Sequence, residues 1–311
     1  MHSYFGDTTL VAIHLCMATE AGWELYRSFL GVLQEGSLSG AARALGITQP
    51  TVGRHVSALE ESLRLTLFTR SQSGLRPTEA ALGLRPYAEE MRSTADALRR
   101  AASSQGEGVK GTVRVSASEV VGVEVLPPIV ARLRQEHPQL TIELVMTNRV
   151  QDLLQREADI AVRMTQPRQE LLIARRVGVV ALGFFAHRDY LARHEAPKTV
   201  AELQRHSLIG FDVETSFLRG ARKTLPQWNR EAFSIRTDSD VGHLALIRAG
   251  CGIGVCQVAL AKRQPELVRV LTSRFELKLP TWVTMHENLR NSPRCRVTFD
   301  ALVKELTAYT S

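Results

Sequence analysis

The stretch of residues 36–70 limits what this chain can fold into more than any other, because its pattern predicts two helices joined by a tight turn. Ser37 or Ser39 can cap the free backbone N–H groups at the start of the first helix. Gly46 can end that helix, since glycine adopts a left-handed backbone at low cost. We therefore expect a short helix, a turn and a longer second helix.

The second helix begins at Thr48, a capping residue, and Pro50 stands in its first turn, where a missing N–H costs nothing. Apolar residues follow at the spacing of one buried helical stripe. The opposite face carries short or hydrogen-bonding groups that suit a DNA major groove. An ordinary helical hairpin packed on another element is the alternative. The stripe consists of Val52, Val56, Leu59 and Leu63, and the polar face of Gln49, Thr51, Gly53, Arg54 and Ser57.

The spacing of small, polar and apolar residues across this stretch resembles that of the LysR-type transcriptional regulators. The resemblance implies a helix-turn-helix that binds double-stranded DNA. The matching positions are Gly36-Ser37, Ala41-Ala42, Leu45, Thr48-Gln49-Pro50, Leu59-Glu60 and Leu67-Phe68-Thr69-Arg70. The expected DNA contacts are Ser37, Ser39, Thr48, Gln49, Pro50, Thr51, Gly53, Arg54, Ser57, Arg70 and Arg76.

Two short strands, Leu67–Arg70 and Leu75–Pro77, flank a turn and predict a wing beside the helices. Such a wing can place Arg70 or Arg76 against phosphate or in the minor groove; a hairpin that only closes the core is the alternative. Residues 20–80 hold six arginines against six glutamates. A positive patch there requires Arg54, Arg70 and Arg76 to lie on one face.

A long helix should follow, capped by Thr78 and running to about Ser103. Leucine or methionine and alanine alternate along it as an a/d heptad seam. The resemblance implies that this helix dimerises the chain; packing against the same chain is the alternative. Pro86 can kink the helix near its start. The seam consists of Leu84, Ala88, Met91, Ala95, Leu98 and Ala102.

Strands and helices alternate from residue 112 onward, which predicts a parallel sheet covered by helices. The resemblance continues here through Leu126-Pro127, Asp159-Ile160-Ala161 and 249–254. It implies two α/β lobes of periplasmic-binding-protein type, hinged by two crossing strands. The expected domains are an extra segment 1–20, a winged helix-turn-helix 21–78, a linker helix 79–104, a hinge 105–111 and an effector domain 112–311. We expect the true start of the chain near Met17. Within the effector domain, lobe I is expected at 112–179 and 281–311 and lobe II at 180–280.

Ligands of open parallel sheets bind beyond the carboxyl ends of the strands, where helix N-termini also point. Hydroxyls and an amide around Arg163 favour a small anion such as a carboxylate. If Arg163 instead pairs with a neighbouring carboxylate, a neutral ligand is the alternative. The expected effector residues are Ser116, Ser118, Thr147, Asn148, Arg163, Phe211, Ser239 and Cys256.

The composition agrees with a soluble protein of several domains: 311 residues, 44% hydrophobic and 23% charged, with a net charge of +7 that suits a polyanionic partner. Four scattered cysteines indicate no disulfide framework, although Cys251 and Cys256 could form a redox switch. The apolar residues 8–18 make a poor signal peptide, since no basic residue precedes them. We expect a cytoplasmic, nucleoid-associated protein.

Three departures from the family pattern bear on these assignments. Gly53 stands where a serine is usual and removes one hydrogen-bonding group from the recognition face. Arg64 replaces a glycine before the wing. Cys256-Gln257 replaces a frequent Leu-Pro in the effector domain.

The function expected is a ligand-responsive transcription factor. Its partners are promoter DNA, a small-molecule effector, a second or further copies of the chain (homodimer or homotetramer) and, as a further candidate, RNA polymerase. A secreted solute-binding protein is the alternative, weakened by the lack of an export signal. The sequence contains no nucleophile elbow, phosphate loop or zinc-protease motif, so no enzyme, cofactor or metal is expected.

Overall fold

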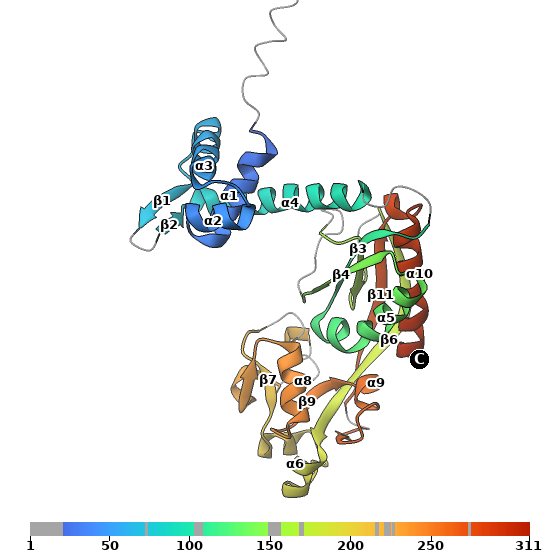
Figure 1. Cartoon of the computed structure of the whole chain (residues 1–311). Helices are drawn as coiled ribbons and strands as arrows, with labels where there is room; N and C mark the ends of the chain where they lie inside the picture. Colours follow the sequence, from blue (N-terminus) through green and yellow to red (C-terminus); the bar gives the residue numbers. More distant parts are fainter. Residues whose placement is uncertain are drawn as a thin grey trace, which may run out of the picture. The chain divides into compact units, whose positions relative to one another are not determined.

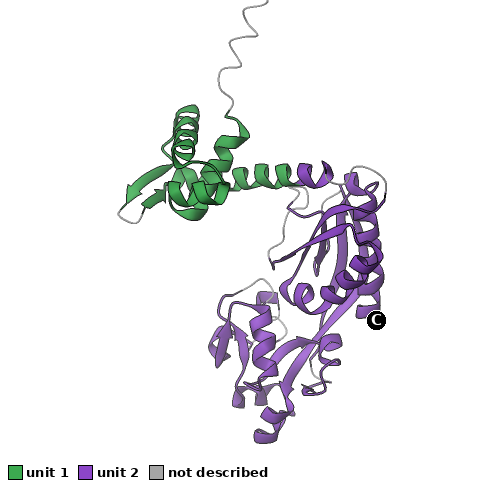
Figure 2. Ribbon diagram, viewed as in Figure 1, with its two compact units in different colours: residues 1–96 green, residues 97–311 purple. Residues whose placement is uncertain are grey.

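The computed structural model describes residues 21–71, 74–102, 108–148, 157–167, 171–214, 218–220, 225, 228–272 and 275–311. The chain forms two compact units, residues 1–96 and 97–311 (Figure 2). The division falls inside one helix rather than at the glycine-rich segment expected as a hinge. The extra segment 1–20, residues 105–107 of that hinge and residues 149–156 lie outside the described residues.

The first unit is a winged helix-turn-helix (Figure 1). Ser37 caps the second helix by accepting a hydrogen bond from the Gly40 N–H at 3.0 Å, and Thr48 caps the third by accepting from the Thr51 N–H at 3.4 Å. Both caps confirm the sequence analysis. The elements are α1 (Trp23–Glu35), α2 (Leu38–Leu45), α3 (Gln49–Leu63), β1 (Phe68–Ser71) and β2 (Gly74–Pro77).

Two glycines allow the wing to lie against the turn between α1 and α2. Gly36 ends α1 with a φ of 68°, and its carbonyl accepts a hydrogen bond from the Leu75 N–H at 2.9 Å. A Cβ at Gly74 would lie 2.6 Å from that carbonyl oxygen, which is too close for any side chain. Arg64 ends α3 at a φ of 55°, so a residue other than glycine adopts a left-handed backbone at the position where the family pattern has glycine.

Helix α4 (Glu79–Ala102) begins at the cap Thr78, whose hydroxyl accepts from the Ala81 N–H at 3.2 Å. The N-terminal half packs on the first unit, where Ala81 and Ala88 are buried and Leu84 is packed against the same core. In the second unit, Ala97 is buried near the other end of the helix. The helix thus has buried residues in both units.

The second unit contains a seven-stranded sheet with the order β10-β6-β11-β5-β3-β4, in which β9 also pairs with β6. Within this sheet only the pairs β3–β4 and β3–β5 are parallel, and the other pairs, including β5–β11, are antiparallel. The expected parallel sheet therefore accounts for part of one lobe. The two long strands β6 and β11 pair with each other as they pass between the lobes (Figure 1). The strands are β3 (Gly111–Ala117), β4 (Leu140–Met146), β5 (Ile160–Arg163), β6 (Leu172–His187), β9 (Gly254–Gln257), β10 (Leu267–Val270) and β11 (Leu277–His286); β7 (Ile209–Phe211) and β8 (Ile235–Thr237) form a separate parallel pair.

Each lobe has its own hydrophobic core. In lobe I the core lies between one face of the sheet and the helices α5 and α10, and includes Val113, Ile160, Val283 and Phe299. A π-helical turn, Val121–Val125, leads into α5 and was not predicted. In lobe II two clusters pack around Phe184 and around Ile247. The helices are α5 (Leu126–Glu136), α6 (Arg188–Arg193), α8 (Asp240–Arg248), α9 (Val258–Ala261) and α10 (Pro293–Thr310), with short 3-10 turns at Ala201–Arg205, Arg230–Ala232 and Glu287–Leu289.

Candidate DNA-binding surface and effector site

Helix α3 has one buried and one exposed face, as the sequence pattern predicts. Val52 and Leu59 are fully buried and Val56 nearly so. On the other side Gln49, Arg54 and Ser57 are exposed and Thr51 is half-buried. Arg54 Nη2 donates to Thr51 Oγ1 at 3.5 Å, a contact weak enough to be exchanged for a base or phosphate.

Gly53 occupies the same face without being required by packing. A Cβ built there would meet only Leu38 Cδ1, at 3.7 Å, which is an ordinary van der Waals contact. The backbone is helical at this position. The usual serine of the family would therefore fit, and its absence is a property of the exposed surface rather than of the core.

Two polar contacts that position α3 were not identified from the sequence. Glu60 Oε1 accepts from the backbone N–H groups of Leu67 and Phe68 at 2.7 and 3.2 Å, and so fixes the start of the wing to the end of α3. Ser28 Oγ and His55 Nδ1 lie 2.8 Å apart and connect α1 with α3. Glu60 was visible in the motif, but its partners depend on how the chain folds back.

The wing arginines do not lie on one face, which corrects the sequence analysis. In the hairpin register Arg76 pairs with Thr69, whereas Arg70 pairs with Leu75. Side chains of paired residues share a face and those of adjacent residues alternate, so Arg70 and Arg76 lie on opposite faces. Both are exposed. Leu75 packs on the core, so Arg76 lies on the outer face of the wing.

The expected dimer seam on α4 is divided between two environments. Leu84 and Ala88 pack on the core of their own unit, as the alternative held for this face. Met91 and Leu98 are exposed, by 38% and 69%, and Tyr87 is 69% exposed on the same side of the helix. Ala95 is half-buried and Ala102 is exposed. The free apolar stripe is therefore Tyr87, Met91 and Leu98.

Arg163, the last residue of β5, lies beside Ser116 of β3. Its Nη2 donates to Ser116 Oγ at 2.6 Å and its Nη1 to the Val162 carbonyl at 2.9 Å, while its buried Nε has no partner. Within the described residues no carboxylate lies at ion-pair distance from this guanidinium. Burial lowers the pKa of Arg163, because desolvation disfavours the charged form, and the more distant Glu157 carboxylate opposes this shift.

A second polar group joins the two lobes. Glu119 Oε2, from the helical segment after β3, accepts from Ser239 Oγ at 2.9 Å and from the Asp240 N–H at 3.0 Å at the start of α8. Asn148 Nδ2 donates to Asp240 Oδ2 at 2.8 Å. Burial, and then the nearby Glu119 carboxylate, raise the pKa of Asp240. The protein's own Glu119 thus occupies the N-terminus of α8, a position that favours anions.

The C-terminal end of α8 is also bound to lobe I. Arg248 donates from both Nη atoms to the Glu124 carboxylate at 2.7 and 2.8 Å. This bidentate hydrogen bond lowers the pKa of Glu124. Glu119 and Glu124 come from the same helical segment of lobe I. Both ends of α8 are therefore attached to that one segment.

The remaining predicted effector residues have mixed surroundings. Ser118 and Thr147 directly follow β3 and β4, and the Thr147 N–H donates to the Ala117 carbonyl at 2.9 Å. Phe211 stacks on the buried His243 with ring centroids 5.1 Å apart. Cys256 instead lies in the core of lobe II, where burial raises the pKa of its thiol to about 12. A protonated, buried thiol is unreactive, so the structure gives no support to the redox alternative.

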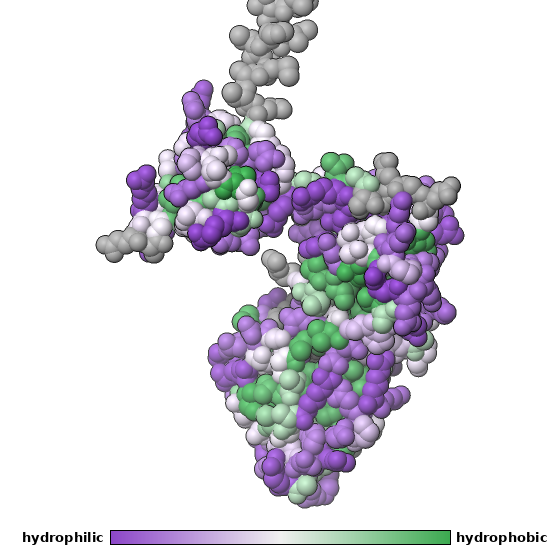
Figure 3. All heavy atoms as spheres, viewed as in Figure 1, coloured by the Kyte–Doolittle hydropathy of each residue, from purple (hydrophilic) through white to green (hydrophobic). Residues whose placement is uncertain are grey.

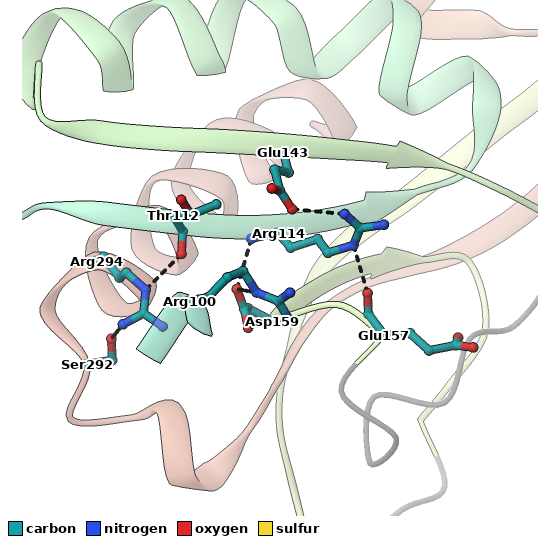
Figure 4. Close-up of polar contacts among 8 residues, drawn as sticks. All are labelled: Arg100, Thr112, Arg114, Glu143, Glu157, Asp159, Ser292 and Arg294. Atoms are coloured by element: carbon teal, nitrogen blue, oxygen red, sulfur yellow. Dashed lines mark hydrogen bonds and ion pairs between the residues drawn. The ribbon is translucent and has the colours of Figure 1, made fainter. Parts of the chain in front are cut away.

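The end of the linker helix is anchored by a buried ion pair (Figure 4). Arg100 Nε donates to Asp159 Oδ2 at 3.1 Å, and both side chains are less than a tenth exposed. The Arg114 backbone N–H donates to the same oxygen at 2.9 Å, while the Arg114 side chain binds Glu143 at the surface. Asp159 immediately precedes β5, whose last residue is Arg163. This pair was not predicted, because its members lie in different domains of the sequence pattern.

Two family models match most of the chain. Residues 23–82 match the bacterial regulatory helix-turn-helix protein of the lysR family, and residues 106–307 match the LysR substrate binding domain. The chain belongs to the LysR family of transcriptional regulators. This family assignment confirms the fold class and the function expected from the sequence.

Other LysR-type regulators are similar over most of their length. The regulator CrgA of Neisseria meningitidis is 26% identical over 284 residues, which cover 89% of this chain and 95% of CrgA. A regulator of Xanthomonas campestris is 30% identical over 184 residues, and this chain spans about half (53%) of its length. The solved structure of CrgA has a TM-score of 0.56 at 25% identity, covering 93% and 99% of the two chains. Full-length CbnR complexed with its target DNA has a TM-score of 0.64 at 19% identity, covering 92% and 99%.

Two kinds of feature are absent from the described part of this LysR-type chain. None of its described helices combines the length and hydropathy needed to cross a bilayer. Nor do the described residues contain a group of three or more His, Cys, Asp or Glu side chains that could hold a metal ion. Much of the visible surface of the first unit is hydrophilic, with smaller hydrophobic areas (Figure 3).

Proposed function

We propose that this regulator reads double-stranded promoter DNA with the exposed face of α3 and responds to a small anionic effector bound by its second unit. The observation that carries the proposal is the division of α3 into a fully buried apolar face and an exposed polar one. Such a helix can enter the major groove without disturbing its own core. CbnR, which shares the fold, has been solved with its target DNA.

Base reading is assigned to Gln49, Thr51 and Arg54, since Gly53 offers no side chain. Ser39, Thr48, Pro50 and Ser57 would lie close to the DNA backbone, and Ser37 serves mainly as a helix cap. Arg76 on the outer face of the wing would contact phosphate; Arg70 lies on the other face. The expected domain limits, 21–78 for DNA binding and 79–104 for the linker helix, remain part of this proposal.

Two copies would pair through the free apolar stripe of α4, formed by Tyr87, Met91 and Leu98. These residues are exposed in the single chain and follow one another at helical spacings of four and seven. A dimer would read two half-sites, and pairs of dimers would form a tetramer. We place the regulator in the cytoplasm, with no catalytic activity and with RNA polymerase as a further contact.

An anionic effector is supported by Arg163, whose pKa burial lowers although the charge of Glu157 opposes the shift, and whose guanidinium forms no ion pair within 4.0 Å with a described carboxylate. Ser116 orients one end of the guanidinium and leaves Nε available. Ser118, Thr147, Asn148, Phe211 and Ser239 would complete the surroundings of the ligand. Cys256 is buried in the lobe II core, so its effect on the ligand would be indirect, through the packing of that core.

Footprinting of the full chain on fragmented genomic DNA, combined with sedimentation of Met91→Glu, tests the proposal. We expect protection of two half-sites one or more helical turns apart, and a variant that sediments as a smaller species and loses that footprint. Protection without sequence preference would contradict the DNA-reading role. A dimer that withstands Met91→Glu and Leu98→Glu together would contradict the assigned stripe.

A further inference from the structure

Three side chains with unused hydrogen-bond donors form a row on one face of the lobe I sheet. Trp282 of β11 pairs with Arg163 of β5 on one side and with Arg176 of β6 on the other. Directly paired residues of adjacent strands lie on the same face, with Cβ atoms about 5 Å apart. The neighbouring Val283 lies on the opposite face and is fully buried in the lobe I core. The row therefore faces away from that core.

All free polar atoms in the row are donors. The Nε of Arg163 and the Nε1 of Trp282 are buried, and neither has a partner among the described residues. Arg176 is exposed and forms no ion pair with the described part of the chain. A buried donor that stays unpaired costs free energy, and a desolvated guanidinium without a carboxylate in hydrogen-bond contact costs more. A ligand rich in acceptor oxygens would satisfy both.

We infer that Arg163, Trp282 and Arg176 together form the acid-binding site of the effector domain, and that they select an organic di-acid. One carboxylate accepts from Arg163 Nε and the indole Nε1, and the second is bound by the Arg176 guanidinium. The inference rests on the proposed anionic effector and adds Trp282 and Arg176, which no motif singled out. Two guanidinium groups on either side of one indole favour two negative charges over one.

The neighbouring residue Arg175 provides a matched control. It precedes Arg176 on the same strand, is also exposed, and lies on the opposite face, paired with Val283. Arg175→Gln and Arg176→Gln change the net charge equally and remove the same side chain. Only Arg176→Gln should affect a ligand bound to the row.

The test is the indole N–H resonance of Trp282 in the full chain labelled with ¹⁵N-tryptophan, assigned by Trp282→Phe among the three tryptophans. Succinate, butyrate, succinamide and sodium chloride at equal ionic strength are the titrants. We expect succinate to shift the Trp282 signal saturably, butyrate to bind several-fold more weakly, and succinamide and chloride to leave it in place. Arg163→Met should weaken succinate at least about tenfold, the loss expected for a charged hydrogen bond.

Arg176→Gln should bring succinate to the affinity of butyrate, whereas Arg175→Gln should leave both unchanged. A Trp282 signal that does not move with any acid, or that moves equally with chloride, overturns the inference. Equal losses in the two glutamine variants overturn it as well. Operator binding, measured on the same samples, stands apart: if it persists while the acids fail to bind, the site is wrong and the regulator function is not.

Discussion

The polar side chains of the first unit are mostly exposed, whereas many of those in the second unit bind one another, and this difference shows how each unit works. In the first unit the functional groups on α3 and the wing are exposed and make few contacts with the rest of the chain. In the second, polar groups bind one another across long stretches of sequence, as Glu119 does with Ser239, 120 positions apart. A reading surface must keep its donors free for DNA, whereas a sensing domain must hold two lobes together.

The largest expected effect comes from the anchor of the linker helix. Asp159→Asn removes the negative charge from the buried pair with Arg100, which should lower the free energy of unfolding by about 3–5 kcal/mol. Urea denaturation measures the loss. The matched control is Glu143→Gln, which breaks the half-exposed Arg114 pair on the adjacent strand and should cost less than about 1 kcal/mol. Equal losses in both variants would mean that the buried Arg100–Asp159 pair contributes no more to stability than the half-exposed Arg114–Glu143 pair.

The buried His243 should make the stability of the second unit depend on pH. Burial lowers the pKa of His243 to about 4, against an ordinary value of 6.5. The unfolded chain therefore binds a proton that the folded chain does not, so stability is full above pH 6.5 and declines as the pH falls toward 4. The loss should reach about 3 kcal/mol. His243 Nε2 accepts a hydrogen bond from the Val255 N–H. The side-chain oxygen of a glutamine can accept the same bond without titrating.

Urea titrations at pH 7 and pH 4.5 of the wild type and of His243→Gln test this expectation. The variant should show a smaller decline over that range. If both proteins lose the same stability, His243 is not the group that titrates.

Substitution of the exposed residues of α3 should change DNA binding and leave the stability of the fold nearly unchanged. Arg54→Ala should weaken binding to a selected operator by about 1–3 kcal/mol if the guanidinium reads a guanine edge. Its unfolding free energy should stay within about 0.5 kcal/mol of the wild type, because the side chain is exposed. Fluorescence anisotropy at fixed salt measures the affinity, and Arg43→Ala on α2 serves as an exposed control. An unchanged footprint and affinity would remove Arg54 from the base-reading set.

The smallest expected effect is at Gly53. Gly53→Ala should raise the free energy of unfolding by about 0.5–1 kcal/mol, since alanine is the better helix former and the space is open. Thermal melting of the full chain detects the change. Destabilisation would show that the glycine serves packing and that this face of α3 is not free.

Local spacing accounts for what could be predicted from the sequence. The caps Ser37 and Thr48 and the stripe of Val52, Val56 and Leu59 all act within one or two helical turns, so their spacing alone identifies them. Strand alternation likewise predicted the first lobe. The position of Arg163 at the end of a strand was enough to nominate it as a ligand group.

Pairing between distant elements accounts for what could not. The opposite faces of Arg70 and Arg76 depend on the register of a hairpin, and the neighbours of Trp282 on the register of three strands. Leu84 and Ala88 have the spacing of a dimer seam, but the same spacing also suits a helix packed on its own domain. A periodic pattern identifies the apolar face of a helix without naming what covers it.

The central claim is that the exposed face of α3 reads bases, and its most direct measurement is a ratio of affinities. The full chain is titrated against its selected operator and against DNA of the same length with the half-sites permuted, at one salt concentration. We predict a preference of at least about a thousandfold for the operator. In the Gln49→Ala/Arg54→Ala variant, operator affinity should fall toward that for permuted DNA. Equal affinity of the wild type for both DNAs, or an undiminished preference in the variant, would contradict the account.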